Sequence, residues 1–128
     1  MGSAVVLDTN ALMMPVERDV RVFEELERLV GAAELLTTRS AIRELERLSE
    51  GGSEEAVAAS VGLDLARERC RIVEDDEQYA DDVLLALARE GDAAYVVTND
   101  GPLRTRLLDA GVPVIALRGR NELAITRP

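Results

Sequence analysis

The sequence predicts an α/β fold in which helices cover both faces of a parallel sheet. Short apolar runs typical of buried strands alternate along the chain with longer amphipathic or alanine-rich segments typical of helices. Regular alternation of this kind favours crossover connections between parallel strands. The sequence shows no repeat, no low-complexity tract and no sign of a second unit, so we expect residues 1–128 to form a single three-layer domain.

Each element is predicted from its own pattern and its boundary residues. Pro15 disfavours a helix directly after the first strand, so a loop is expected over 9–18. Ser40 is a suitable N-cap for the second helix, and glycines follow the first two helices. Strands are expected at 4–7, 34–37, 70–74, 94–98 and 113–117, with a short edge segment at 123–125. Helices are expected at 19–30, 41–50, 54–69, 79–90 and 102–110.

The composition is that of a globular protein with an aliphatic core. Apolar residues make up 47% of the 128 residues, but there is one Phe, two Tyr and no Trp, so a base-stacking platform is not expected. The single Cys70 permits no intramolecular disulfide, in keeping with a reducing compartment. No apolar run approaches the length of a membrane span. We therefore expect a soluble, cytoplasmic protein without a membrane partner.

The chain contains no Lys and no His, so all fifteen of its basic residues are Arg. This absence excludes a phosphate-loop NTPase, which needs a lysine, and a serine hydrolase, which needs an imidazole. Receiver domains and haloacid-dehalogenase-type phosphatases also place an acid after a first strand, but both rely on a lysine as well. The remaining chemistry is that of carboxylates, hydroxyls, Arg and a metal ion.

The net charge of −10, from 25 acidic and 15 basic residues, has two readings. Affinity for phosphate backbones comes from cationic contacts, so this charge argues at face value against a nucleic-acid partner. An acidic surface without lysine is also typical of proteins from a halophilic archaeon. At molar salt the Debye length falls to about 3 Å, and net charge then says little about the ligand.

Four stretches place carboxylates where an α/β fold can direct them to one cleft: VVLDTN, SAIRELERL, YADDVLLALA and YVVTND. Asp8 directly follows the first predicted strand, and Asp100 closely follows the fourth. Ligands of open parallel sheets bind outside the carboxyl ends of the strands. Acids placed there, with no basic residue in a comparable position beside them, indicate a site for a divalent metal ion.

Taken together, VVLDTNALMMP, SAIRELERL, ADDVLLALA, VVTND, LRTRL and GVPVIALR resemble the PIN domain (PilT N-terminus) family over nearly the whole chain. The resemblance is greater to small archaeal members similar to the PIN nucleases of ribosomal RNA processing than to VapC-type toxins. It implies a parallel sheet of about five strands in the order 3-2-1-4-5. It also implies ribonuclease activity with Mg²⁺ or Mn²⁺ held by three or four acids.

Matched to the family motifs, Asp8 is the first catalytic and metal-binding acid and Asn10 its supporting polar residue. Glu44 matches the second acid and Asp100 the fourth. Toxins carry a further Asp where this chain has Pro102, and this difference favours the processing-type members.

The third acid has two candidates, because Asp81 and Asp82 are adjacent. The spacing to Thr98 favours Asp82 as the ligand and leaves Asp81 as a supporting residue. Thr98 is expected either to hydrogen-bond a metal-bound water or to satisfy backbone groups at the strand end. Two arginines, Arg104 and Arg106, follow Asp100 closely enough to bind a phosphate.

Each acid also has a purely structural reading. Asp8 would cap the turn after the first strand, and Asp100 would cap the helix that begins at Asp-Gly-Pro. Glu44 shares a helix face with apolar residues and would instead form a salt bridge to an Arg. Asp81 and Asp82 lie in the first turn of a helix, where the helix dipole favours acids in any case.

The function predicted from the sequence is a metal-dependent endoribonuclease that hydrolyses RNA phosphodiester bonds, in RNA processing. Two alternatives stay open: a catalytically weak RNA-binding or assembly module with the same fold, and a VapC-type toxin. Candidate partners besides RNA are a second copy of the chain, an antitoxin and a ribosome-assembly protein.

Overall fold

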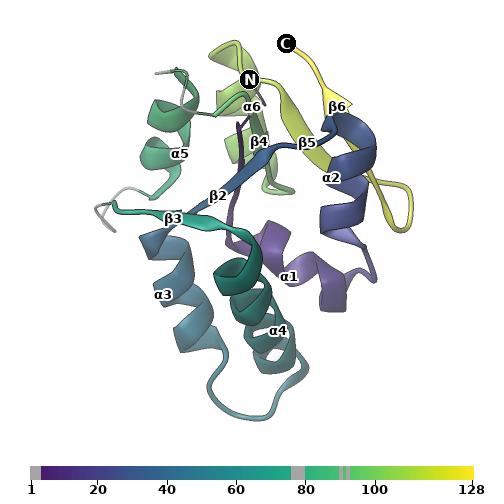
Figure 1. Ribbon diagram of the computed structural model, residues 1–128, viewed down its shortest axis with the longest axis vertical. Helices are drawn as coiled ribbons and strands as arrows, with labels where there is room; N and C mark the ends of the chain where they lie inside the picture. The colour runs from purple at the N-terminus through teal and green to yellow at the C-terminus, as the bar shows by residue number, and fades with distance from the viewer. Residues whose placement is uncertain (1–3, 76–79, 90, 92) are drawn as a thin grey trace.

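The computed structural model describes residues 4–75, 80–89, 91 and 93–128, which form one α/β domain around a single six-stranded sheet (Figure 1). The sheet order is β3-β2-β1-β4-β5-β6. The strands are β1 (Ala4–Leu7), β2 (Glu34–Thr38), β3 (Arg71–Val73), β4 (Tyr95–Val97), β5 (Val114–Arg118) and β6 (Glu122–Thr126). The helices are α1 (Thr9–Glu17), α2 (Val22–Val30), α3 (Arg39–Leu48), α4 (Glu54–Arg69), α5 (Ala80–Arg89) and α6 (Gly101–Asp109).

The five strands predicted from the sequence are all parallel and have the order 3-2-1-4-5, which confirms the expected fold. The edge segment expected at 123–125 is a full sixth strand, β6, antiparallel to β5. Two residues of α2 hold it: Leu123 N donates to Glu25 Oε1 at 2.9 Å, and Arg28 Nη2 donates to Leu123 O at 2.9 Å. The hydrogen bonds from Arg28 and from the Leu123 amide lower the pKa of Glu25 to about 2.

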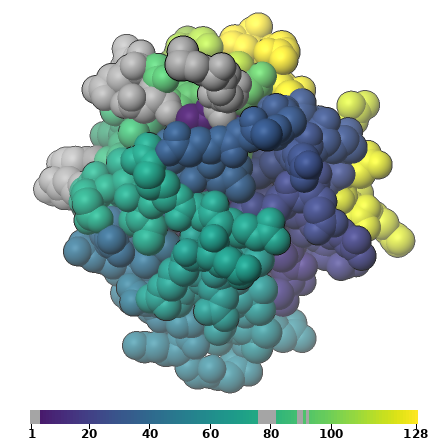
Figure 2. Space-filling view, viewed as in Figure 1, coloured from purple at the N-terminus to yellow at the C-terminus, as the bar shows by residue number. Residues whose placement is uncertain are grey.

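Side chains of the central strand β1 alternate between two apolar cores, one on each face of the sheet. Val5 and Leu7 belong to the core formed with α1, α2, α3 and α4, whereas Val6 belongs to the core formed with α5 and α6. The strands β2 and β3 with helices α2 and α4 make up most of the face seen in Figure 2, and little of β1 is visible there. A strand buried on both faces explains the continuous apolar run before Asp8.

The loop expected over 9–18 is wrong, because this segment forms the helix α1 with Pro15 inside it. Proline in a helix interior costs about 3 kcal/mol. Here the cost is offset by the N-cap at Asp8 and by burial of four consecutive side chains, from Ala11 to Met14. The next helix, α2, begins at Val22 rather than at residue 19, and Asp19 takes the left-handed conformation with φ 52°.

The helix α4 packs directly on the backbone of α1. A Cβ atom added to Gly62 of α4 would lie 2.5 Å from the carbonyl oxygen of Leu12 in α1. The same face of α4 carries small buried residues, Ala58, Ala59 and Ala66. The small residues allow the two helix backbones to approach closely, and α4 thereby fixes α1, the helix that Asp8 caps.

The other boundaries agree with the expected ones within a few residues. Every segment predicted as a strand is a strand, and every segment predicted as a helix is a helix. The helix expected at 79–90 appears as α5, and residues 79 and 90 lie outside the described residues. None of the helices in the described ranges is long and apolar enough to cross a membrane.

Candidate active site

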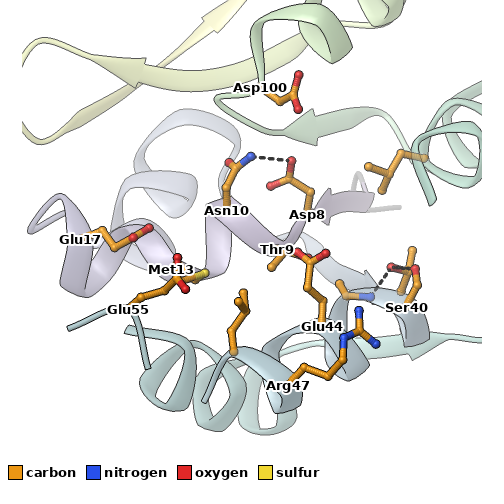
Figure 3. Close-up of a pocket in the computed structure, with 14 residues that line it drawn as sticks. Asp8, Thr9, Asn10, Met13, Glu17, Ser40, Glu44, Arg47, Glu55 and Asp100 are labelled. Carbon is orange, nitrogen blue, oxygen red and sulfur yellow. Dashed lines mark hydrogen bonds between the residues drawn. The ribbon is translucent and has the colours of Figure 1, made fainter. Parts of the chain in front are cut away.

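Three of the predicted acids line one cleft of about 490 Å³: Asp8, Glu44 and Asp100 (Figure 3). Asp8 directly follows β1, and Asp100 lies three residues after the end of β4. Glu44 projects from α3, which directly follows β2. The cleft therefore lies where the carboxyl ends of parallel strands bring their following residues together.

Asp8 caps α1, as its structural interpretation predicted, and it also lines the cleft. Its Oδ1 accepts a hydrogen bond from Ala11 N at 2.8 Å, and its Oδ2 accepts one from Asn10 Nδ2 at 3.2 Å. Asn10 therefore supports the Asp8 carboxylate, as the family motif implied. These bonds hold the carboxylate in one orientation at the edge of the cleft.

Asn99, which the sequence interpretation missed, connects the loop after β4 to two other elements. Asn99 N donates to Asn10 Oδ1 at 3.1 Å, and its side-chain Oδ1 accepts from Leu117 N of β5 at 2.8 Å. The only sequence signal was its place between Thr98 and Asp100. The Asn10–Asn99 contact holds the loop that carries Asp100 next to the start of α1, where Asp8 lies.

Asp100 caps α6, as its structural reading predicted, and it also lines the cleft. Its Oδ1 accepts from Leu103 N at 3.0 Å, while its own backbone N–H donates to Thr98 Oγ1 at 3.1 Å. Thr98 is fully buried, so its hydroxyl satisfies backbone at the strand end. Asp100 is exposed, and within the described ranges its Oδ2 has no hydrogen-bond partner.

Glu44 is exposed, and within the described residues it makes no hydrogen bond or ion pair. The salt bridge considered for it is therefore not formed. Its helix is held at the N-terminus by two side chains. Thr38, rather than the expected Ser40, is the N-cap, with Oγ1 accepting from Ala41 N at 3.1 Å. Asp75, beyond the end of β3, accepts from Ser40 N at 2.8 Å.

Replacing Asp75 by alanine is expected to lower the free energy of unfolding by about 1 kcal/mol, because Ser40 N at the start of α3 loses its acceptor. Asp75→Asn keeps an acceptor oxygen and should lose less than half as much. Thermal unfolding of both variants at neutral pH measures the difference. Equal melting temperatures for the two variants would show that this hydrogen bond does not stabilise α3.

Asp82, the predicted third acid, is not among the residues that line the cleft, although Leu84 of the same helix is. Its carboxylate forms an ion pair with Arg106, with Oδ1 and Nη2 2.6 Å apart. The structure therefore pairs two residues that were expected to act separately: Asp82 was predicted to bind the metal ion, and Arg106 was predicted to bind a phosphate. The side chain of Asp81 lies outside the described residues. Arg104 does not line the cleft either, and among the described residues its buried Nε has no hydrogen-bond partner.

Comparison with known proteins shows which family the chain belongs to. The family described as a PIN like domain matches residues 5–120. The chain belongs to the PIN-like family. Ribonuclease VapC4 of Methanocaldococcus jannaschii is 30% identical to it over 127 residues, covering 94% of this chain and 95% of that protein. The structure of the PIN domain endonuclease Utp24 superposes with a TM-score of 0.78 at 24% identity, over 98% of this chain and 92% of that one.

The donor set of this PIN domain suits a hard divalent cation. Asp8, Glu44 and Asp100 offer only oxygen atoms, the ligand type that Mg²⁺ and Mn²⁺ prefer. Within the described ranges, no three acidic or Cys side chains already form a group close enough to enclose an ion. An ion held by these acids would therefore have to keep several of its waters, as Mg²⁺ commonly does.

Proposed function

We propose that this PIN domain is a metal-dependent endoribonuclease that hydrolyses RNA phosphodiester bonds. The observation that carries the proposal is the convergence of Asp8, Glu44 and Asp100, from three separate segments, on one cleft. The similarity to Ribonuclease VapC4 supports the same reaction class. The chain also shares its fold, on which these acids are placed, with the endonuclease Utp24, and this likeness is in keeping with the proposal.

In this proposal Asp8, Glu44 and Asp100 hold Mg²⁺ or Mn²⁺, and Asp82 joins them when it leaves Arg106. Such an ion, when bound, lowers the pKa of a coordinated water and offsets negative charge on the phosphate. Asn10 keeps the Asp8 carboxylate oriented. Glu44 lines the cleft and has no other partner within the described ranges, which supports a role for its carboxylate in binding the ion or a water beside the scissile phosphate.

Two observations favour other candidates. The similarity to VapC4 favours a toxin ribonuclease with an antitoxin as its partner, rather than a processing enzyme. The ion pair between Asp82 and Arg106 favours an RNA-binding or assembly module, because it withholds one acid from the cleft. Both candidates make definite predictions about metal dependence: the toxin cleaves RNA with metal, whereas the module binds RNA without cleaving it.

The test is cleavage of single-stranded and structured RNA with Mn²⁺ or with EDTA, at low and at molar KCl. The ribonuclease proposal expects cleavage with Mn²⁺ only. We also propose a salt-rich cytoplasm as the working environment, because the chain has a net charge of −10 and no lysine. Screening should then raise activity and melting temperature at molar KCl. RNA binding without cleavage in every condition would instead establish the binding module.

A further inference from the structure

The cleft that holds the acids also has a cation in its wall. Among the described residues that line it, Arg47 of α3 is the one basic residue. It is exposed and makes no ion pair within the described ranges. Several other arginines do have carboxylate partners: Arg39 with Glu74, Arg67 with Glu46, Arg71 with Glu34 and Arg106 with Asp82. An unpaired guanidinium in an acidic cleft remains available to an anionic ligand.

Arg47 lies three residues after Glu44 on α3, so both side chains project from neighbouring positions of the helix, about 4.5 Å apart along its axis. Figure 3 shows the Arg47 side chain beside Glu44 at the wall of the cleft. The caps from Thr38 and Asp75 fix the start of this helix. The distance between the acidic centre and the Arg47 guanidinium is therefore set by a rigid element.

We propose that Arg47 binds the RNA phosphate adjacent to the scissile one and so positions the strand across the acids. The inference rests on the proposed ribonuclease function. A guanidinium can bind two oxygens of a phosphate at once, which fixes orientation as well as position. The acids of the cleft repel the negatively charged RNA. Arg47, about one helix turn from Glu44, offsets that repulsion at the next phosphate of the RNA strand.

The first test compares Arg47→Gln and Arg47→Lys with Arg21→Gln, on single-stranded RNA in Mn²⁺. Arg21 is an exposed residue preceding α2, paired with Glu24, so this control makes the same charge change away from the cleft. Arg47→Gln should raise KM about tenfold with kcat nearly unchanged, because the contact is made equally in ground and transition states. Arg47→Lys should recover part of the loss, and Arg21→Gln should match the unmodified protein.

The second test replaces single phosphates of that RNA, one on each side of the cut, by uncharged methylphosphonates. At one of these positions the replacement should raise KM for the unmodified protein about tenfold and have little further effect on Arg47→Gln. An unchanged KM in Arg47→Gln, or equal sensitivity of both proteins to every replacement, would overturn the assignment. If the unmodified protein cuts no RNA with Mn²⁺, the proposed function fails. The dissociation constants of the same RNAs and variants, measured by fluorescence anisotropy, then decide the role of Arg47 separately: weaker binding by Arg47→Gln supports it, and equal binding overturns it.

Discussion

Asp8→Asn is expected to lower Mn²⁺-dependent RNA cleavage by about 10³-fold while leaving the fold intact. The substitution removes one negative charge from the cleft, so the ion is held less well. A bound ion stabilises the charge of the transition state by several kcal/mol, and each 1.4 kcal/mol lost lowers the rate about tenfold. Asparagine caps helices about as well as aspartate, so the bond from Ala11 N is kept. The bond from Asn10 Nδ2 is lost, because an amide offers only one acceptor oxygen. The melting temperature in EDTA should therefore fall by only a few degrees, and the stabilisation by Mn²⁺ should disappear.

Asp64→Asn is the matched control for this experiment. Asp64 is exposed on α4, outside the cleft, and its substitution makes the same change in net charge. Initial cleavage rates and melting temperatures with and without Mn²⁺ should be the same for this variant as for the unmodified protein. Cleavage that persists in Asp8→Asn would show that Asp8 is only a helix cap.

Gly62→Ala is expected to destabilise the protein by about 2 kcal/mol, even though alanine is the better helix former by about 1 kcal/mol. The added Cβ would lie 2.5 Å from Leu12 O, and a backbone carbonyl cannot move aside as a flexible side chain can. The helices α1 and α4 must separate to accommodate it. A melting temperature lower by about 8 °C in a calorimetric scan is the expected result.

Gly52→Ala provides the control for Gly62→Ala, because a Cβ at Gly52 has no atom within 4 Å. This variant should be neutral or slightly more stable, since alanine restricts the unfolded chain. Gly62→Ala should also lower the cleavage rate, because α1 starts next to Asp8 and carries Asn10. Unchanged stability in Gly62→Ala would show that the two helices tolerate a wider spacing than this structure has.

The sheet was predictable because its signals are local. Each buried strand has a short apolar run, and parallel connections follow from the alternation of strands and helices. The helix α1 was missed because Pro15 is a strong local signal against it. Burial of the preceding side chains, from Ala11 to Met14, is a tertiary effect that exceeded the cost of the proline.

The candidate site was predictable where an acid directly follows a strand, and less so where its partners come from elsewhere in the chain. Asp8 and Asp100 line the cleft as expected. The contacts of Asn99 with Asn10 and of Asp75 with Ser40 join residues far apart in the sequence, and no local pattern announces them. The pairing of Asp82 with a residue of α6 is of the same kind.

The most direct test of the central claim is a calorimetric titration of Mn²⁺ into the unmodified protein and into Glu44→Gln. Glu44 is exposed and makes no hydrogen bond within the described ranges, so its substitution should leave the fold unchanged and report on the ion alone. If the cleft acids hold the metal, the unmodified protein binds Mn²⁺ with a measurable heat and Glu44→Gln binds it at least tenfold more weakly. Identical isotherms for the two proteins, or no heat in either up to millimolar Mn²⁺, would contradict a metal site in this cleft.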